Sequence, residues 1–379
     1  MTQTHDPDMG VYPVAGQLMS IHDLLARFAD PNYRRNGIPR ISDLHLKVGE
    51  PARFRFDSEL IPLPDGAPIT TSMMDGLLLP LLGPEHTSRL LGSTPADIDA
   101  GYEWEHIGLS FRINAFHDRE GLAATIRVLP RHIPDVERVG FPTEQHWRDL
   151  VQLKQGLVIV TGVTGSGKST TIASLVQHIN RTQRTRIITL EDPVEYVLRS
   201  DRSLISQREL GKHIPSFGAG LRSALREDPD IIFVGEMRDR ETAGLALTAA
   251  ETGHLVLSTM HTRDAKGAIT RLVDLFPPER SKELCSQISF SLHSVIGQKL
   301  VPRADRTGRR VAMEVLRNIP AISNLIRTGA WHQIYSTMQT QYREGIVTLE
   351  RHLLDLVTQG EVNMEDAVRS ANEPAVLQR

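Results

Sequence analysis

Residues 157–170 have the sequence LVIVTGVTGSGKST, in which an apolar run leads directly into a glycine-rich loop. The segment that follows, residues 170–180, is compatible with a helix. The order strand, glycine loop, helix is the setting in which the pattern G-x-x-x-x-G-K-[ST] binds phosphate. The alternative is a glycine-rich turn that matches by chance, but every required position is filled here. The sequence therefore predicts a nucleoside triphosphate site.

Each residue type in this loop has a physical reason. Glycines let the backbone curl so that successive N–H groups point at phosphate oxygens, and the start of the helix adds a partial positive charge. Lys168 is expected to reach the β- and γ-phosphates, and the Ser169 hydroxyl to coordinate Mg²⁺. The predicted nucleotide-binding residues are Gly162, Thr164, Gly165, Ser166, Gly167, Lys168, Ser169 and Thr170.

Two further apolar segments end in acidic residues. The first, residues 187–190, leads into EDPVE at residues 191–195, where Glu195 is the candidate to orient the attacking water or accept its proton. The second, residues 231–234, is followed by Glu236, the candidate to hold Mg²⁺ directly or through water. In a doubly wound sheet the nucleotide lies at the carboxyl ends of the strands. A solvated acidic turn is the alternative for Glu195.

Two histidines flank the next predicted strand. Residues 241–252 favour a helix, and residues 255–259 form an apolar strand pattern between His254 and His261. A single histidine is more often a packed or surface residue than a catalytic one. Because His261 follows a central strand directly, we predict that it senses the γ-phosphate. For His254 the packed and catalytic interpretations stay equally open.

The chain of 379 residues is long enough for two or three domains, and its patterns divide it into four parts. Residues 1–40 are predicted as an N-terminal extension, and residues 41–130 as a small α+β domain with alternating strand patterns. Residues 131–143 contain prolines and a glycine without any period, which predicts an interdomain linker. Residues 144–379 alternate strands and helices and end in helices, so they predict an α/β domain with a mainly parallel sheet.

Composition restricts which partners and which cellular compartment are expected for the protein. The net charge of −3 gives no global electrostatic reason to expect nucleic acid. Cys285 is the only cysteine, which excludes an internal disulfide and a zinc site made of cysteines alone. The sequence has no signal-peptide pattern and no apolar run of membrane-spanning length. We therefore expect a cytoplasmic protein that meets a membrane through partners.

Several short motifs between residues 161 and 254 occur together. They are TGVTGSGKSTT at 161–171, EDPVE at 191–195, REDPD at 226–230, GEMRD at 235–239 and TAAETGH at 248–254. This combination resembles the PilT-type ATPases, which belong to the type II/type IV secretion ATPases. The resemblance covers roughly residues 41–357. It implies a PAS-like N-terminal domain, a RecA-like doubly wound ATPase core with a helical C-terminus, and ATP with Mg²⁺.

The resemblance also implies roles for individual residues. It places the catalytic glutamate of the Asp box on Glu195 and the Walker B glutamate on Glu236. The two histidines of the His box fall on His254 and His261. Two arginines of the N-terminal domain, which the family brings near the phosphates, match Arg112 and Arg127. A solvent-facing strand charge is the alternative interpretation of those arginines.

The family forms rings, so the resemblance implies a homo-hexamer at the inner face of the inner membrane. A membrane platform protein of the pilus and related pilus ATPases are the expected partners, and nucleic acid is not. Because Cys285 is the only cysteine, the zinc insertion of assembly and secretion relatives is missing, which favours pilus retraction and twitching motility. Ser323 in AISNLIR, residues 321–327, stands where retraction ATPases usually carry arginine, so an accessory or secretion role stays open.

Two other classes of function remain as alternatives. A RecA- or helicase-like nucleic-acid motor shares the predicted core fold, but neither the composition nor any aromatic cluster suggests a strand-binding channel. A regulatory protein that binds ATP without hydrolysing it is the other alternative. Lys168, Glu195 and Glu236 argue against it, whereas Ser323 keeps it open.

Overall fold

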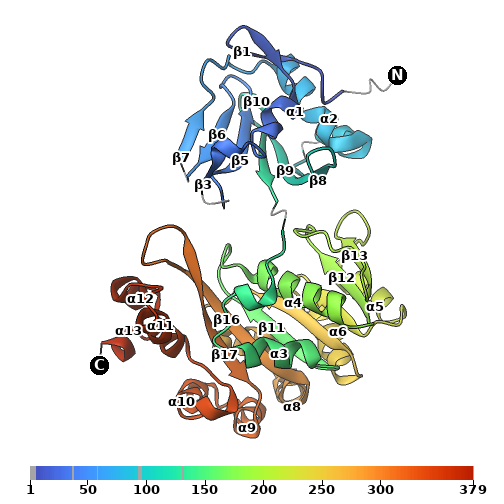
Figure 1. The fold of residues 1–379 in the computed structure, drawn as a ribbon. Helices are drawn as coiled ribbons and strands as arrows, with labels where there is room; N and C mark the ends of the chain where they lie inside the picture. The colour runs from blue at the N-terminus through green and yellow to red at the C-terminus, as the bar shows by residue number, and fades with distance from the viewer. Residues whose placement is uncertain (1–5, 36–37, 58, 93–95, 130–131, 379) are drawn as a thin grey trace. The chain divides into compact units, whose positions relative to one another are not determined.

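The fold is taken from a computed structural model, which describes residues 6–35, 38–57, 59–92, 96–129 and 132–378 (Figure 1). The chain divides into two compact units, one up to residue 132 and one from residue 133 onward. The division falls within the segment predicted as a linker, residues 131–143. We describe each unit by itself.

Among its described residues, the N-terminal unit contains a six-stranded antiparallel sheet in the order β7-β6-β5-β10-β9-β8 and two α-helices. Short strand pairs, β1 with β2 and β3 with β4, lie outside that sheet. The described elements are β1 Tyr12–Val14, β2 Gln17–Met19, α1 Ile21–Ala26, β3 Arg34–Arg35, β4 Ile38–Pro39, β5 Ile41–Lys47, β6 Arg53–Phe56, β7 Glu59–Pro62, α2 Thr71–Leu90, β8 Ile98–Trp104, β9 Leu109–Asp118 and β10 Gly121–Val128.

The segment before residue 41 contributes to the core of this unit. Tyr12, Leu24 and Phe28 are buried in the same apolar cluster as the inward-facing side chains of the sheet. The Tyr12 hydroxyl also accepts a hydrogen bond from the backbone N–H of Ala52 at 3.0 Å. Residues 1–40 therefore include packed elements, β1, β2 and α1. Sequence patterns do not reveal this packing, because each of these elements is only three to six residues long.

Helix α2 shows the interruption that its prolines predict. Pro80 and Pro84 lie inside this element, and its backbone is broken at Gly83, with φ 70° and ψ 166°. A side chain at that backbone position would be strained, so glycine suits it. The two halves of α2 both reach the core, with Met74 and Leu77 before the break and Leu90 after it.

The C-terminal unit contains a seven-stranded sheet in the order β13-β12-β14-β15-β11-β16-β17. All neighbouring strands are parallel except the edge strand β17, which is antiparallel to β16. The predicted doubly wound RecA-like core is therefore confirmed. Its strands are β11 Gly156–Thr161, β12 Arg186–Glu191, β13 Leu204–Glu209, β14 Ile231–Val234, β15 Leu255–Met260, β16 Leu292–Pro302 and β17 Arg309–Arg317.

The unbroken apolar sequence of β11 follows from burial on both faces of the sheet. Leu157 and Ile159 enter one core cluster, whereas Val158 and Val160 enter the cluster on the opposite face. Side chains alternate along a strand, so a strand covered on both sides needs apolar residues throughout. The mainly parallel sheet brings the carboxyl ends of β11, β12, β14 and β15 to one edge.

Helices surround this sheet, and the C-terminal stretch predicted as helical is helical (Figure 1). None of the helices in the described part of the chain combines the length and the apolar character that crossing a bilayer requires. The helices are α3 Glu144–Gln152, α4 Lys168–Thr182, α5 Phe217–Ala224, α6 Arg240–Glu251, α7 Ala265–Asp274, α8 Ser281–Ser291, α9 Pro320–Thr328, α10 Ile334–Thr340, α11 Leu349–Thr358, α12 Met364–Ser370 and α13 Pro374–Leu377.

Candidate functional site

The glycine loop joins the end of β11 to the start of α4, as predicted. Gly165 and Gly167 have positive φ angles of 77° and 90°, the left-handed region that favours glycine. A Cβ atom at Gly162 would lie 2.5 Å from both Ser166 Oγ and the carbonyl oxygen of Gln298. Backbone conformation and close packing therefore both require glycines in this loop.

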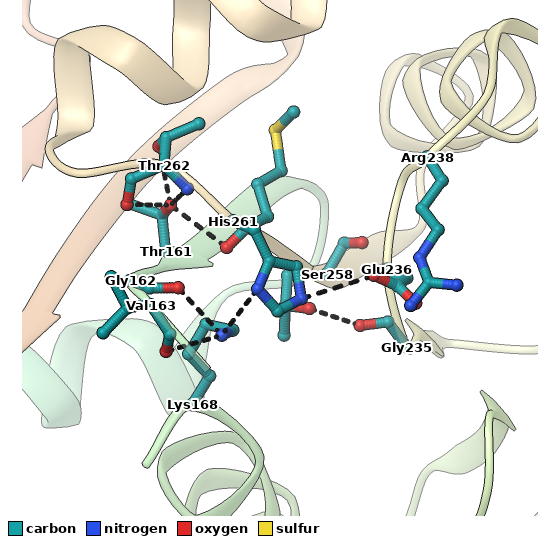
Figure 2. A network of polar contacts seen from close by, with 12 residues as sticks. Thr161, Gly162, Val163, Lys168, Gly235, Glu236, Arg238, Ser258, His261 and Thr262 are labelled. Carbon is teal, nitrogen blue, oxygen red and sulfur yellow. Dashed lines mark hydrogen bonds and ion pairs between the residues drawn. The ribbon is translucent and has the colours of Figure 1, made fainter. Parts of the chain in front are cut away.

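Lys168 is held inside the loop (Figure 2). Its Nζ donates hydrogen bonds to the carbonyl oxygens of Gly162 at 2.9 Å and Val163 at 3.2 Å, and lies 3.5 Å from His261 Nδ1. Only 7% of the residue is exposed, and burial lowers the pKa of Lys168 while the charges of Glu236 and Glu195 oppose that shift. A buried ammonium group at the start of a helix is suited to an anionic ligand.

Gln298 on β16 supports the loop from the neighbouring strand. Its Nε2 donates to the carbonyl oxygen of Ser166 at 2.6 Å, and its Oε1 accepts a hydrogen bond from Thr171 Oγ1 at 2.9 Å. Gln298 is buried. Sequence reasoning missed this residue, because it lies far along the chain from the loop and reaches it only through the pairing of β11 with β16.

Glu236 follows β14 and is nearly buried beside the loop. One carboxylate oxygen pairs with Arg238, and the other lies 3.4 Å from His261 Nε2. Figure 2 shows Lys168, the His261 ring and Glu236 in sequence across the site. In the described part of the chain, Ser166 Oγ is buried without a hydrogen-bond partner, and Glu236 Oε2 is buried with only the 3.4 Å ion-pair contact to His261. Buried polar atoms with unused hydrogen-bonding capacity beside a glycine loop and a buried lysine fit a polar ligand.

His261 begins the loop between β15 and α7. Burial, followed by the charge of Lys168, lowers the pKa of His261, which favours the neutral imidazole between the lysine and the glutamate. The next residue, Thr262, shares a 2.7 Å hydroxyl–hydroxyl hydrogen bond with Thr161 at the end of β11. His261 thus directly follows β15 and lies beside Lys168. Its role in sensing the γ-phosphate stays a prediction.

Glu195 lies on the segment that follows β12, where the Asp192–Pro193 peptide bond is cis. Its charge influences the pKa of Lys168, of Glu191 and of Tyr196, so it lies near the phosphate loop. Tyr196 connects this segment to α4 through a 2.8 Å hydrogen bond between its hydroxyl and Thr170 Oγ1. Lys168, Glu195, Glu236 and His261 therefore belong to one edge of the sheet.

His254 does not reach this edge. It precedes β15, and its backbone carbonyl accepts a hydrogen bond from the N–H of Gly156 at the start of β11. Its Nδ1 contacts the carbonyl oxygen of Ala249 at 3.1 Å, at the end of α6. The six residues of β15 separate the two ends of the strand by roughly 20 Å at about 3.3 Å per residue. Within this unit, His254 therefore supports the end of α6 and not the phosphate loop.

Arg112 and Arg127 belong to the N-terminal unit and pair directly across β9 and β10. Directly opposed residues share one face of an antiparallel sheet. Arg127 Nε donates to Asp43 Oδ1 at 2.6 Å, and Asp43 is almost fully buried. The Arg127 side chain is nevertheless 63% exposed. The two guanidinium groups thus form a cationic pair on one sheet face, and their part in nucleotide binding stays a prediction.

The loop after His261 rests on a buried carboxyl group. Glu314 on β17 accepts a 2.7 Å hydrogen bond from the backbone N–H of Ala265, the first residue of α7. Burial raises the pKa of Glu314 to about 7, with the charges of Asp264 and Glu350 acting in the same direction. The folded protein therefore binds a proton here that the unfolded chain releases at lower pH.

We expect Glu314→Gln to raise the thermal stability of the protein above that of the natural chain, and to do so more at pH 8 than at pH 5. Between the usual pKa of about 4.5 and the folded value of about 7, only the folded state holds this proton, so the free energy of unfolding falls as pH rises. Glutamine does not titrate, so the variant does not show this decrease in the free energy of unfolding, which is about 1–3 kcal/mol. Thermal unfolding at several pH values measures it. Glu365→Gln, at an exposed position on α12, is the control, and an equal effect of both variants would contradict the assignment.

Comparison with known proteins identifies the group to which the chain belongs. Residues 95–370 match the family described as "Type II/IV secretion system protein". The chain is 40% identical over 336 residues to the "Type IV pilus retractation ATPase PilT" of Pseudomonas aeruginosa, covering 88% of this chain and 95% of that one. It is 46% identical over 275 residues to a "Twitching motility protein" of Neisseria gonorrhoeae, covering 73% of each chain.

A solved structure agrees with these relatives. The crystal structure titled "Pilus Retraction Motor PilT and Bound ADP" superposes with a TM-score of 0.82 at 41% identity, covering 89% of this chain and 95% of that one. The resemblance to PilT-type ATPases is thereby confirmed. With its phosphate loop, its acidic strand ends and a family match over most of its length, this chain belongs to the type II/IV secretion system protein family.

Proposed function

We propose that this protein is an ATPase that powers type IV pilus retraction. The observation that carries the proposal is the contact series Lys168–His261–Glu236 at the carboxyl edge of the sheet. This series couples a phosphate-binding cation to the acid expected to organise the hydrolytic water. Relatives named for pilus retraction and twitching motility, at 40% and 46% identity, supply the biological setting.

In this proposal each side chain has one task during hydrolysis of ATP to ADP and phosphate. Lys168 leaves the carbonyl oxygens of Gly162 and Val163 and binds the β- and γ-phosphates. Glu195 accepts the proton of the attacking water. Ser169 and Glu236 are the residues that would hold Mg²⁺, which neutralises phosphate charge when bound. Neutral His261, between the lysine and Glu236, is placed to respond to the presence of the γ-phosphate.

The mechanical step rests on the N-terminal unit. Arg112 and Arg127 are proposed to bind the triphosphate from that unit, either in the same subunit or in a neighbour of a hexameric ring. Loss of phosphate would remove this attraction, and the linker, residues 131–143, would then allow the units to rotate. We propose that the ring acts on a platform protein at the cytoplasmic face of the inner membrane, with related pilus ATPases as further partners. Nucleic acid is expected to leave the rate of hydrolysis unchanged.

Arg112→Ala is expected to keep ATP affinity within a fewfold of the natural chain and to lower turnover by about 10- to 1,000-fold. The reason is that an arginine that meets the γ-phosphate stabilises transition-state charge more than it stabilises bound ATP. Phosphate-release assays and titration with a fluorescent ATP analogue measure the two quantities. Arg119→Ala, at the exposed turn between β9 and β10, is the matched control. Normal turnover in Arg112→Ala would rule out this role.

A gene deletion tests the biological assignment. We expect cells without the protein to carry excess surface fibres that do not retract, and we expect the natural gene, but not Glu236→Gln, to restore retraction. Fluorescently labelled pili allow extension and retraction to be counted in single cells. Unchanged retraction in the deletion strain would contradict the role as the retraction motor.

An accessory or secretion ATPase is the second candidate function, and Ser323 favours it. Its hydroxyl donates to the carbonyl oxygen of Ser289 at 2.9 Å, so it bonds α9 to α8. An arginine at this position, as retraction ATPases usually have, would offer a charged group to a partner instead. If deletion lowers only the force or frequency of retraction, the accessory role is supported.

A further inference from the structure

Two side chains of the edge strand β13, Gln207 and Glu209, hold the segment that carries Glu195. This segment, residues 192–198, runs from the end of β12 past Tyr196. Gln207 lies on β13, directly beside Thr189 of β12 in the parallel register. From there its amide reaches Glu191, just before the segment, and Tyr196 and Leu198 near the end of the segment. Neither the phosphate-loop motif nor the acidic boxes include Gln207.

The amide group of Gln207 uses its donors and its acceptor on three partners. Its Oε1 accepts a hydrogen bond from the backbone N–H of Leu198 at 2.7 Å. Its Nε2 donates to the carbonyl oxygen of Tyr196 at 2.9 Å and to Glu191 Oε1 at 2.9 Å. A primary amide offers two N–H donors and a carbonyl acceptor, so this arrangement matches its chemistry. A carboxylate or an apolar side chain of the same size could not replace it.

Hydrogen bonds of the residues on either side of Glu195 explain why the bonds of Gln207 affect its position. Tyr196, the next residue, is tied to Thr170 at the start of α4. Val194, the preceding residue, donates its N–H to Glu209 Oε2 at 3.3 Å. Gln207 thus fixes the backbone on the far side of Glu195 and also contacts Glu191, which is buried at the end of β12. The position of Glu195 relative to the phosphate loop depends on both ends of this segment.

We propose that Gln207 is a positioning residue for ATP hydrolysis, which sets the location of the Glu195 carboxylate relative to the phosphate loop. The proposal rests on the proposed function, in which Glu195 receives the proton of the attacking water. The contacts of the Gln207 amide are to Glu191, Tyr196 and Leu198. It acts through the backbone of residues 196 and 198, and misplacement of a catalytic group by about 1 Å can cost a factor of about 100 in rate.

The test compares Gln207→Leu with the natural chain and with Gln152→Leu, a control at an exposed position on α3. Steady-state kinetics are expected to show kcat lowered about tenfold or more in Gln207→Leu. KM and the affinity for a non-hydrolysable ATP analogue stay within about twofold, because the phosphate loop is unchanged. The control should match the natural chain. A Gln207→Leu kcat within twofold of the natural chain, or lost nucleotide binding, would overturn the proposal.

A double variant separates positioning from general weakening of the structure. If Gln207 acts through Glu195, then Gln207→Leu has little further effect on kcat when Glu195→Gln is already present. An equal fold-loss in both backgrounds would overturn the positioning role. Natural turnover in Glu195→Gln alone would instead contradict the proposed function, because the proton acceptor would then be another group. An incorrect positioning role for Gln207 and an incorrect catalytic role for Glu195 therefore give different experimental results.

Discussion

Lys168→Ala is expected to abolish ATP hydrolysis and to weaken ATP binding by at least about tenfold. The variant loses the buried ammonium group that pairs with the carbonyl oxygens of Gly162 and Val163 and is expected to transfer to the phosphates. A hydrogen bond to a charged group contributes about 1.5–3 kcal/mol, which corresponds to a factor of about 10 to 150 in binding. The transition state carries more charge on the γ-phosphate, so turnover suffers more than affinity.

The matched control is Lys154→Ala, an exposed lysine just before β11 whose Nζ contacts Gln183. It changes the same charge without touching the loop, and we expect natural affinity and turnover. Titration with a fluorescent nucleotide and phosphate-release assays provide both quantities for each variant. Hydrolysis at the natural rate in Lys168→Ala would show that the glycine loop does not bind the reacting phosphates.

Glu236→Gln is expected to bind ATP and to turn it over at least about 100-fold more slowly than the natural chain. The amide keeps the shape of the side chain but loses the negative charge that faces Arg238 and His261. Groups that orient water or stabilise charge in the transition state typically contribute factors of 100 or more. Because the variant keeps ATP binding but hydrolyses ATP slowly, most of it should be found with ATP bound.

Single-turnover kinetics separate these two effects, since they report binding and chemistry independently. The control is Glu365→Gln on α12, whose carboxylate pairs with Arg369 at the surface. It should behave as the natural chain does. If Glu236→Gln lost ATP binding along with hydrolysis, Glu236 would have a structural role, and unchanged turnover would exclude it from the reaction.

Those parts of the site that consist of residues adjacent in the sequence could be predicted, because short sequence motifs determine their local structure. The glycine loop can be recognised from neighbouring residues alone. The apolar segments before Glu195 and Glu236 identify strands whose carboxyl ends meet at one edge. The mainly parallel sheet itself followed from the alternation of strand and helix patterns. The sheet edge at which we expect the nucleotide to bind could therefore be predicted from the sequence.

Contacts between distant residues could not be predicted in this way. Gln298 supports Ser166 from a strand more than a hundred residues later, and Gln207 reaches Glu191 and Tyr196 only because β13 lies beside β12. A single sequence contains no signal for such pairings.

His254 is a different case, because its motif suggested a catalytic position but its place before β15 puts it at the opposite end of that strand from His261. The spacing of the two histidines around one strand already contains that information.

The most direct test of the central claim is a structure of the full chain with Mg²⁺ and a non-hydrolysable ATP analogue. We predict that Lys168 Nζ leaves the carbonyl oxygens of Gly162 and Val163 and contacts the β- and γ-phosphates, with Glu236 beside the bound metal and a guanidinium group of Arg112 or Arg127 at the γ-phosphate. A triphosphate bound away from the loop, with Lys168 still on those carbonyl oxygens, would contradict the account.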